Sequence, residues 1–94
     1  MTYAVELSEK CVKALNKLER KDKASYELVI KHLKKLEQNP EYFGKPLTGA
    51  LSGLWSCRAG FLRIIYQIKD DAKVVFVVTI GHRKNVYEKG DSYE

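Results

Sequence analysis

The stretch LTGALSGLWSCRAGFLRIIYQIKDDAKVVFVVTIGHRKNVY, residues 47–87, decides the fold. It contains three runs with strand character, 54–58, 61–69 and 73–80, in which β-branched and aromatic residues are frequent. The breaks between these runs are two and three residues long, which is the usual length of a hairpin turn. The stretch therefore predicts three neighbouring antiparallel strands, joined as a meander.

Side chains alternate between the two faces of a strand, so the parity of each position predicts which face it occupies. In the first run, burial of Trp55 turns Arg58 away from the core, and in the middle run Arg63 alternates with apolar residues. A core face that ends at Ile80 leaves Arg83 on the opposite side, so we expect the three arginines to converge on one open face. The predicted core face holds Trp55, Cys57, Leu62, Ile64, Tyr66, Ile68, Val74, Phe76, Val78 and Ile80, and the middle run presents Phe61, Arg63, Ile65 and Gln67 on the open face.

The first half of the chain predicts one more strand and two helices. Residues 3–7 alternate in polarity and predict a strand that joins the later sheet. Ser8 is a candidate N-cap for a helix over residues 9–19, and Asp22 is a candidate N-cap for a longer helix that ends before Pro40. We therefore predict an α+β fold of order β-α-α-β-β-β, in which a helical hairpin packs on one face of a small, mostly antiparallel sheet.

Length and composition indicate one small globular domain. We predict that this domain spans residues 1–89 and that residues 90–94 form a frayed tail. We expect a cytoplasmic protein, because no apolar run approaches the roughly 18 residues of a membrane helix and the N-terminus lacks a secretory signal. Cys11 and Cys57 fit no metal-ligand spacing, so we expect two buried free thiols, no metal and no cofactor.

The net charge of +5 is concentrated in the half of the chain that forms the meander. Residues 44–89 carry eight basic and three acidic side chains, whereas residues 1–43 have a net charge of +2 and residues 90–94 one of −2. The lysines of the two predicted helices fit a solvated helix surface. A basic sheet favours a polyanion such as nucleic acid, or an acidic protein, as the partner.

Two segments carry a family resemblance: KPLTGALSGLWSCRAGFLRIIYQI, residues 45–68, and VVFVVTIGHRKNVY, residues 74–87. In order and spacing they resemble the RelE/ParE superfamily of toxins from prokaryotic toxin–antitoxin pairs. The resemblance covers essentially the whole chain, because a strand and a helical hairpin precede this block in the family too. It implies a RelE-like fold and a small RelB-like antitoxin that covers the basic face with an amphipathic helix and acidic residues.

The resemblance also implies an activity. RelE-like members enter the ribosomal A site and cut messenger RNA without a metal, by attack of a ribose 2′-oxygen on the adjacent phosphate. Such an mRNA interferase needs in-line positioning, positive charge around the phosphate and proton transfer at two oxygens. Arginine supplies the charge through a fixed fork of donors, but its high pKa makes it a poor base.

Site residues follow from the resemblance position by position. Arg63 matches the arginine that braces the scissile phosphate, Arg83 matches one that acts near the leaving oxygen, and Tyr87 matches a tyrosine that stacks on a base or assists proton transfer. These three are the candidate catalytic residues. The candidate substrate-binding residues are Arg58 for phosphate, His82 as an acid or base near neutral pH, Phe61 as a stacking or antitoxin contact, and Lys45 and Lys84 as further cations.

One departure from the family pattern leaves alternatives open. RelE members with well-understood cleavage carry two lysines on the strand equivalent to residues 54–58, where this chain has Leu54 and Ser56. Neither side chain carries charge or takes a proton at neutral pH. The same scaffold could therefore be a ParE-like inhibitor of DNA gyrase that cuts no RNA, or a decayed toxin that only binds its antitoxin.

Overall fold

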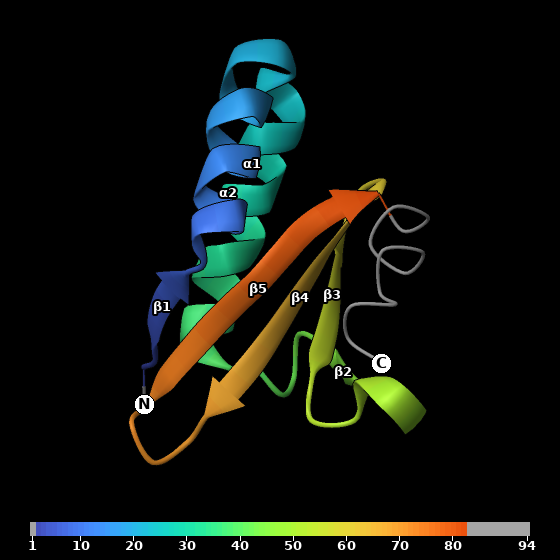
Figure 1. The fold of residues 1–94 in the computed structure, drawn as a ribbon. Helices are drawn as coiled ribbons and strands as arrows, with labels where there is room; N and C mark the ends of the chain where they lie inside the picture. Colours follow the sequence, from blue (N-terminus) through green and yellow to red (C-terminus); the bar gives the residue numbers. More distant parts are fainter. Residues whose placement is uncertain (1, 83–94) are drawn as a thin grey trace.

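Two helices pack against a five-stranded sheet in the computed structural model, which describes residues 2–82 (Figure 1). The strand order across the sheet is β1-β5-β4-β3-β2, with β1 parallel to β5 and all other neighbours antiparallel. The α+β class is confirmed, but the predicted order β-α-α-β-β-β lacks one short strand, at Lys45–Pro46 before the meander. Neither helix is long and apolar enough to cross a membrane. The elements are β1 (Ala4–Leu7), α1 (Glu9–Lys21), α2 (Lys23–Gln38), β2 (Lys45–Pro46), a 3-10 helix (Gly49–Leu51), β3 (Trp55–Ala59), β4 (Leu62–Lys69) and β5 (Val74–His82).

Both predicted helix caps are confirmed. The Ser8 hydroxyl accepts a hydrogen bond from the backbone N–H of Cys11 at 3.1 Å and donates one to the carbonyl of Val78 at 2.7 Å. This cap therefore also ties the start of α1 to β5. The carboxylate of Asp22 accepts hydrogen bonds from the backbone N–H and the hydroxyl of Ser25, and these bonds lower the pKa of Asp22.

The core lies between the helical hairpin and one face of the sheet, where α1 packs on β5 and α2 packs on β3. Both cysteines are buried free thiols there, as predicted, and burial raises the pKa of Cys11 to about 12 and that of Cys57 in the same direction. The helices contribute Cys11, Leu15, Val29, Leu33 and Leu36, and the sheet contributes Cys57, Ala59, Leu62, Ile64, Tyr66, Val75, Val77 and Ile80.

The predicted inward-facing positions are right for β4 but wrong for the first half of β5. Ile65 pairs with Thr79, and the next residue, Tyr66, pairs with Val77, so the pairing skips Val78. This extra residue forms a β-bulge, which inverts the alternation on its N-terminal side. As a result Val75 and Val77 are fully buried, Val74, Phe76 and Val78 are half-buried, and Ile80 remains in the core as predicted.

The end of β5 also differs from the prediction. The strand was expected to end at Ile80, with Gly81 releasing the chain from the sheet, but it continues to His82, which pairs with Leu62. β5 is longer than predicted because Gly81 still pairs with Arg63 of β4. Arg83, Lys84, Tyr87 and the predicted tail 90–94 lie outside the described residues.

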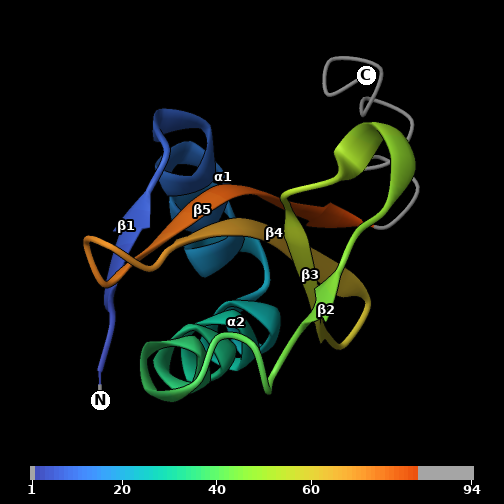
Figure 2. The same ribbon diagram turned by 90° about the horizontal axis from the view of Figure 1, so that it is seen from below.

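A buried tyrosine fixes the segment between α2 and β2, whose path to the sheet edge is visible in Figure 2. The Tyr66 hydroxyl donates a hydrogen bond of 2.6 Å to the carbonyl of Pro40, and Trp55 stacks beside the ring at a centroid distance of 6.5 Å. Burial raises the pKa of Tyr66, so the phenol stays a donor. Gly44 passes so close to this hydroxyl that a Cβ atom there would collide with it. Tyr66 therefore sets the position of the loop that follows α2.

Candidate functional site

Two arginines face each other on the side of the sheet opposite the helices. Arg58 on β3 and Arg63 on β4 are direct partners in the antiparallel pairing, so their side chains project from the same face with Cβ atoms about 5 Å apart. The exposed Arg58 donates from Nε to the carbonyl of Gly60 at 3.3 Å, whereas Arg63 is half-buried. On its other side Arg63 pairs with Gly81, which adds no side chain. The predicted convergence of Arg58 and Arg63 is confirmed, and Arg83 lies outside the described residues.

The next row of residues on this face brings in a lysine. Lys45 on β2 pairs with Ser56, Ser56 pairs with Ile65, and Ile65 pairs with Thr79. Ile65 is buried, with 2% of its surface exposed, and Ser56 and Thr79 are buried as well. The expectation that this face is open at Ile65 is therefore wrong, because β4 is the central strand and its residues are flanked on both sides. The exposed side chain of Lys45 lies at the rim of this row.

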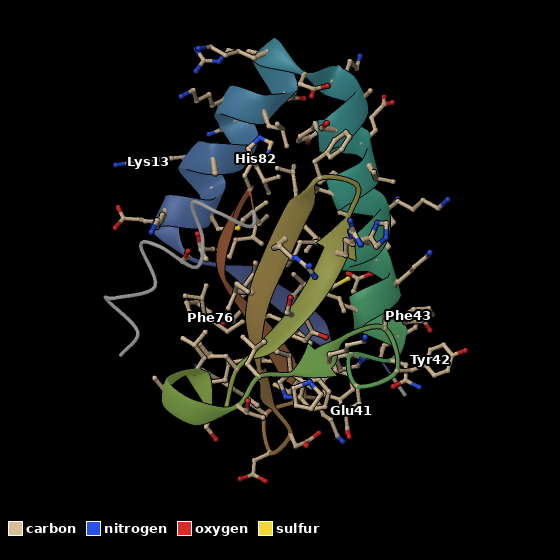
Figure 3. The ribbon with its side chains drawn as sticks, turned by 90° about the vertical axis from the view of Figure 1, so that its right-hand side faces the viewer. Lys13, Glu41, Tyr42, Phe43, Phe76 and His82 are labelled. Carbon is tan, nitrogen blue, oxygen red and sulfur yellow. The ribbon has the colours of Figure 1, made fainter. Side chains whose placement is uncertain are left out.

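A groove of about 440 Å³ runs beside these residues, between α2, the loop that follows it and the edge of β3. Figure 3 shows Tyr42 and Phe43 on that loop, beside the end of α2. None of the described residues that line the groove is acidic. We call this groove the basic groove. Its basic side chains are His32, Lys35, Lys45, Arg58 and Arg63.

The remaining predicted residues lie at different distances from the arginine pair. Phe61, in the turn between β3 and β4, is 85% exposed and lies two residues before Arg63, so it borders the pair. His82 is exposed at the end of β5 and, by its pairing with Leu62, projects toward the helix side of the sheet. Figure 3 places His82 away from Tyr42. The structure therefore brings Phe61, but not His82, next to the arginines.

The chemistry that the described residues support is the binding of anions. Within residues 2–82, no group of three or more His, Cys, Asp or Glu side chains lies close enough together to hold a metal ion. A guanidinium group binds phosphate or carboxylate through two parallel hydrogen bonds. Two such groups, those of Arg58 and Arg63, are paired directly across neighbouring strands. The groove is therefore suited to an anionic group with several acceptor oxygens.

Sequence reasoning missed the part of the groove that α2 and the following loop provide. His32 and Lys35 are three residues apart and so share a face of α2, and Tyr42 and Phe43 follow in the loop. The spacing of the two basic residues is visible in the sequence. Their closeness to Arg58 is not, because it depends on how α2 packs against β3.

Comparisons with known proteins show the family of this chain. Residues 5–87 match the family described as ParE toxin of type II toxin-antitoxin system, parDE. The chain belongs to the RelE/ParE superfamily of toxins. A putative RelE-like toxin protein from Escherichia coli is 33% identical, with 99% of this chain and 92% of that protein aligned. Toxin RelG from Mycobacterium tuberculosis is 35% identical over 54 residues, which cover 57% of this chain and 62%, less than two thirds, of RelG.

The fold of this RelE/ParE toxin is also found among solved structures. The crystal structure of the toxin–antitoxin complex RelBE2 from Mycobacterium tuberculosis matches it with a TM-score of 0.78 and 28% sequence identity. The match covers 88% of this chain and 100% of that chain. The superfamily predicted from the sequence and its RelE-like fold are thus confirmed.

Proposed function

We propose that this toxin is a ribosome-dependent mRNA endonuclease of the cytoplasm. A ribose 2′-oxygen gives up its proton and attacks the adjacent phosphate, the bond from phosphorus to the 5′-oxygen breaks, and that oxygen takes up a proton, which leaves a 2′,3′-cyclic phosphate and a 5′-hydroxyl. The observation that carries the proposal is the direct pairing of Arg58 with Arg63 in the basic groove. Like charges placed directly opposite each other destabilise a sheet, so this pair favours a bound anion between them. Phosphoryl oxygens gain negative charge in the transition state, and two guanidinium groups stabilise that charge.

RelE members with well-understood cleavage carry two lysines at the positions of Leu54 and Ser56, and we propose that Lys45 supplies the missing positive charge in this chain. Leu54 is half-buried and Ser56 is buried, so neither position presents an ammonium group. Lys45 pairs with Ser56, lies on the same face and lines the basic groove with Arg58 and Arg63. Its ammonium donates protons and adds positive charge near the scissile phosphate. The roles of Arg83 at the leaving oxygen and of Tyr87 at a base rest on the family pattern alone.

We further propose that a RelB-like antitoxin is the protein partner of this chain. Two observations support this partner: the related RelBE2 structure is a toxin–antitoxin complex, and the basic groove has no acidic residue among its described lining side chains. An acidic segment of the antitoxin would neutralise the groove and block access of RNA to it.

A second candidate function is inhibition of DNA gyrase. It is favoured by the match to the ParE family and by Leu54 and Ser56 at the positions of the family lysines. In this case the basic groove would bind its target without RNA cleavage.

The two functions are separated by primer-extension mapping of a defined mRNA on programmed ribosomes. We expect cuts at A-site codons with the wild-type toxin, and a loss of about 10²-fold to 10³-fold in cleavage rate for Arg63→Ala and Lys45→Ala, the usual effect of removing one transition-state donor. Lys17→Ala, an exposed lysine on α1, is the matched control and should cleave normally. Absence of cuts from the folded wild-type chain, together with inhibition of gyrase supercoiling, would establish the second function instead.

A further inference from the structure

We propose that the outer end of the basic groove, formed by His32, Lys35, Tyr42 and Phe43, is a second contact site for single-stranded RNA. It would hold a nucleotide that flanks the one at the arginine pair, with its phosphate on Lys35, a hydrogen bond to Nε2 of His32 and its base on Tyr42. The identity of the ligand as RNA rests on the proposed function. The site itself rests on four observations about its residues.

Lys35 is held in the groove by an aromatic ring. Its ammonium nitrogen lies 5.7 Å from the centroid of the Phe43 ring, a cation–π contact, and the residue is half-buried. Its carbonyl accepts the hydrogen bond from the Asn39 N–H that ends α2. The charge is thus placed in advance and needs little ordering when a phosphate binds.

His32 lies one turn earlier on the same face of α2. Its Nδ1 is 2.9 Å from the carbonyl oxygen of Leu28, so Nδ1 carries the proton and donates to that oxygen. This bond fixes the ring orientation and leaves Nε2 for a ligand. In this tautomer Nε2 is a hydrogen-bond acceptor, which suits a ribose hydroxyl.

Tyr42 is a fixed aromatic ring with most of its surface exposed. Its backbone N–H bonds to the side-chain oxygen of Asn39 at 3.1 Å, and its ring meets the Phe43 ring edge to face at a centroid distance of 4.9 Å. The residue is nonetheless 76% exposed, and Figure 3 shows it at the rim of the molecule beside α2. An exposed ring next to ordered cations is the combination that stacks bases in single-strand binding proteins.

The groove connects this ring to the arginine pair along the outer edge of β3. β2 pairs with β3 only at Trp55 and Ser56, so the next residues of β3 border the groove instead of a further strand in the described part of the chain. The volume of about 440 Å³ lies within the range of roughly 300–1,000 Å³ found for ligand sites. An acidic protein segment would use the cations but not the exposed ring of Tyr42, so the residues favour nucleic acid.

The test is the affinity of the purified chain for RNA that it cannot cleave. Fluorescence anisotropy would be measured with 2′-O-methyl oligoribonucleotides of about two and roughly eight nucleotides, the longer one within the site size of single-strand binding folds. The variants are Lys35→Gln and Tyr42→Ala. Lys34→Gln is the matched control, because Lys34 is the neighbouring lysine of α2 and is exposed outside the groove. Thermal melting confirms that each variant is folded.

We expect Tyr42→Ala to weaken binding of the longer oligonucleotide about tenfold, since stacking on one aromatic ring contributes roughly 1–3 kcal/mol per base. Lys35→Gln should weaken it about fivefold and reduce the slope of log affinity against log salt by about 0.7, the value for one phosphate contact on a single strand. The short oligonucleotide, which reaches only the arginine pair, should bind both variants like the wild type. Lys34→Gln should leave both affinities unchanged.

Equal affinity of the longer oligonucleotide for wild type, Lys35→Gln and Tyr42→Ala would overturn the second contact site. The proposal would also be overturned if both variants bound RNA normally but lost affinity for an acidic peptide such as oligoglutamate. That result would assign the groove to a protein segment. Failure of the proposed function looks different, because the wild-type chain would then leave mRNA uncut on ribosomes. Uncut mRNA would not affect the anisotropy result, because the effect of Lys35→Gln and Tyr42→Ala on RNA binding is measured without cleavage.

Discussion

The two faces of β4 differ in what surrounds their side chains. On one face Leu62, Ile64 and Tyr66 pack against the helices, and the tyrosine hydroxyl is satisfied by the carbonyl of Pro40. On the other face Arg63 lies opposite a second arginine and beside a glycine. The first arrangement lowers the energy of the folded chain, whereas the second places like charges together at a cost. The helix-facing side therefore stabilises the fold, and we propose that the arginine side binds an anionic ligand.

The largest effect on stability should come from the helix-facing side. Tyr66→Ala removes a fully buried ring and its hydrogen bond, so we expect a loss of about 3–5 kcal/mol in the free energy of unfolding. Gln67→Ala, at the exposed neighbouring position of β4, should change it by less than about 0.5 kcal/mol. Urea unfolding checks both. A similar small change in the two variants would show that the core does not depend on Tyr66.

The arginine side should respond in the opposite way. Arg63→Gln removes a charge that faces Arg58, so we expect unchanged stability or a gain of about 0.2–1 kcal/mol, while mRNA cleavage falls by about 10²-fold or more. Urea unfolding and primer extension on the same preparation give both values. Loss of stability and activity together would mean that Arg63 supports the fold, and the contrast between the faces would fail.

The fold itself was largely predictable from local sequence, and the exceptions have physical causes. Ser8 and Asp22 cap the helices as predicted, because a cap is decided within a few residues of the chain. In β5 the residues VVFVV, 74–78, are apolar at both parities, so the sequence there does not reveal the bulge at Val78. Only the pairing with β4 decides which of these residues enter the core.

The candidate site was predictable in part for the same reason. Arg58 and Arg63 flank a tight turn, so their meeting on one face follows from strand parity. Lys45 was expected among the substrate-binding residues as a further cation, and its pairing with Ser56 gives its position beside the arginines. The contribution of His32 and Lys35 depends on the docking of α2 against β3, which no short-range pattern encodes.

A smaller loss should follow when the link between core and groove is cut without making a large cavity. Tyr66→Phe leaves the buried carbonyl of Pro40 without its donor, so we expect a loss of about 1–3 kcal/mol in the free energy of unfolding. Because this bond positions the loop with Tyr42 and Phe43, hydrogen exchange of that loop should also become faster. Unaltered exchange at Tyr42 and Phe43 would show that the core does not set the position of the groove.

Stability should rise when backbone strain in the turn between β4 and β5 is removed. Lys73 adopts a positive φ of 54°, which glycine tolerates better, so Lys73→Gly should stabilise the chain by about 0.5–1 kcal/mol. The gain is limited because the Lys73 ammonium also lies 5.2 Å from the centroid of the Tyr3 ring. Ala72→Gly in the same turn is the control and should not stabilise. A loss of stability in Lys73→Gly would mean that the cation–π contact outweighs the strain.

The smallest effect concerns the cap of α2. Hydrogen bonds from Ser25 lower the pKa of Asp22, so the ionised cap stabilises the folded chain above the ordinary carboxyl pKa of 3.8. This stabilisation is lost as the pH falls through the lowered pKa. Between about pH 5 and pH 3, unfolding of Asp22→Ala should therefore depend less on pH than unfolding of the wild type. Parallel pH profiles of the two chains would argue against the cap.

The most direct test of the contrast between the faces is a double-mutant cycle on Arg58 and Arg63. We would measure urea unfolding of wild type, Arg58→Gln, Arg63→Gln and the double variant at low salt, with and without a non-cleavable oligoribonucleotide. We predict a coupling free energy of about 0.2–1 kcal/mol that destabilises the free protein and becomes favourable when RNA is bound. A favourable coupling without RNA would contradict the account, because the arginine pair would then support the fold itself.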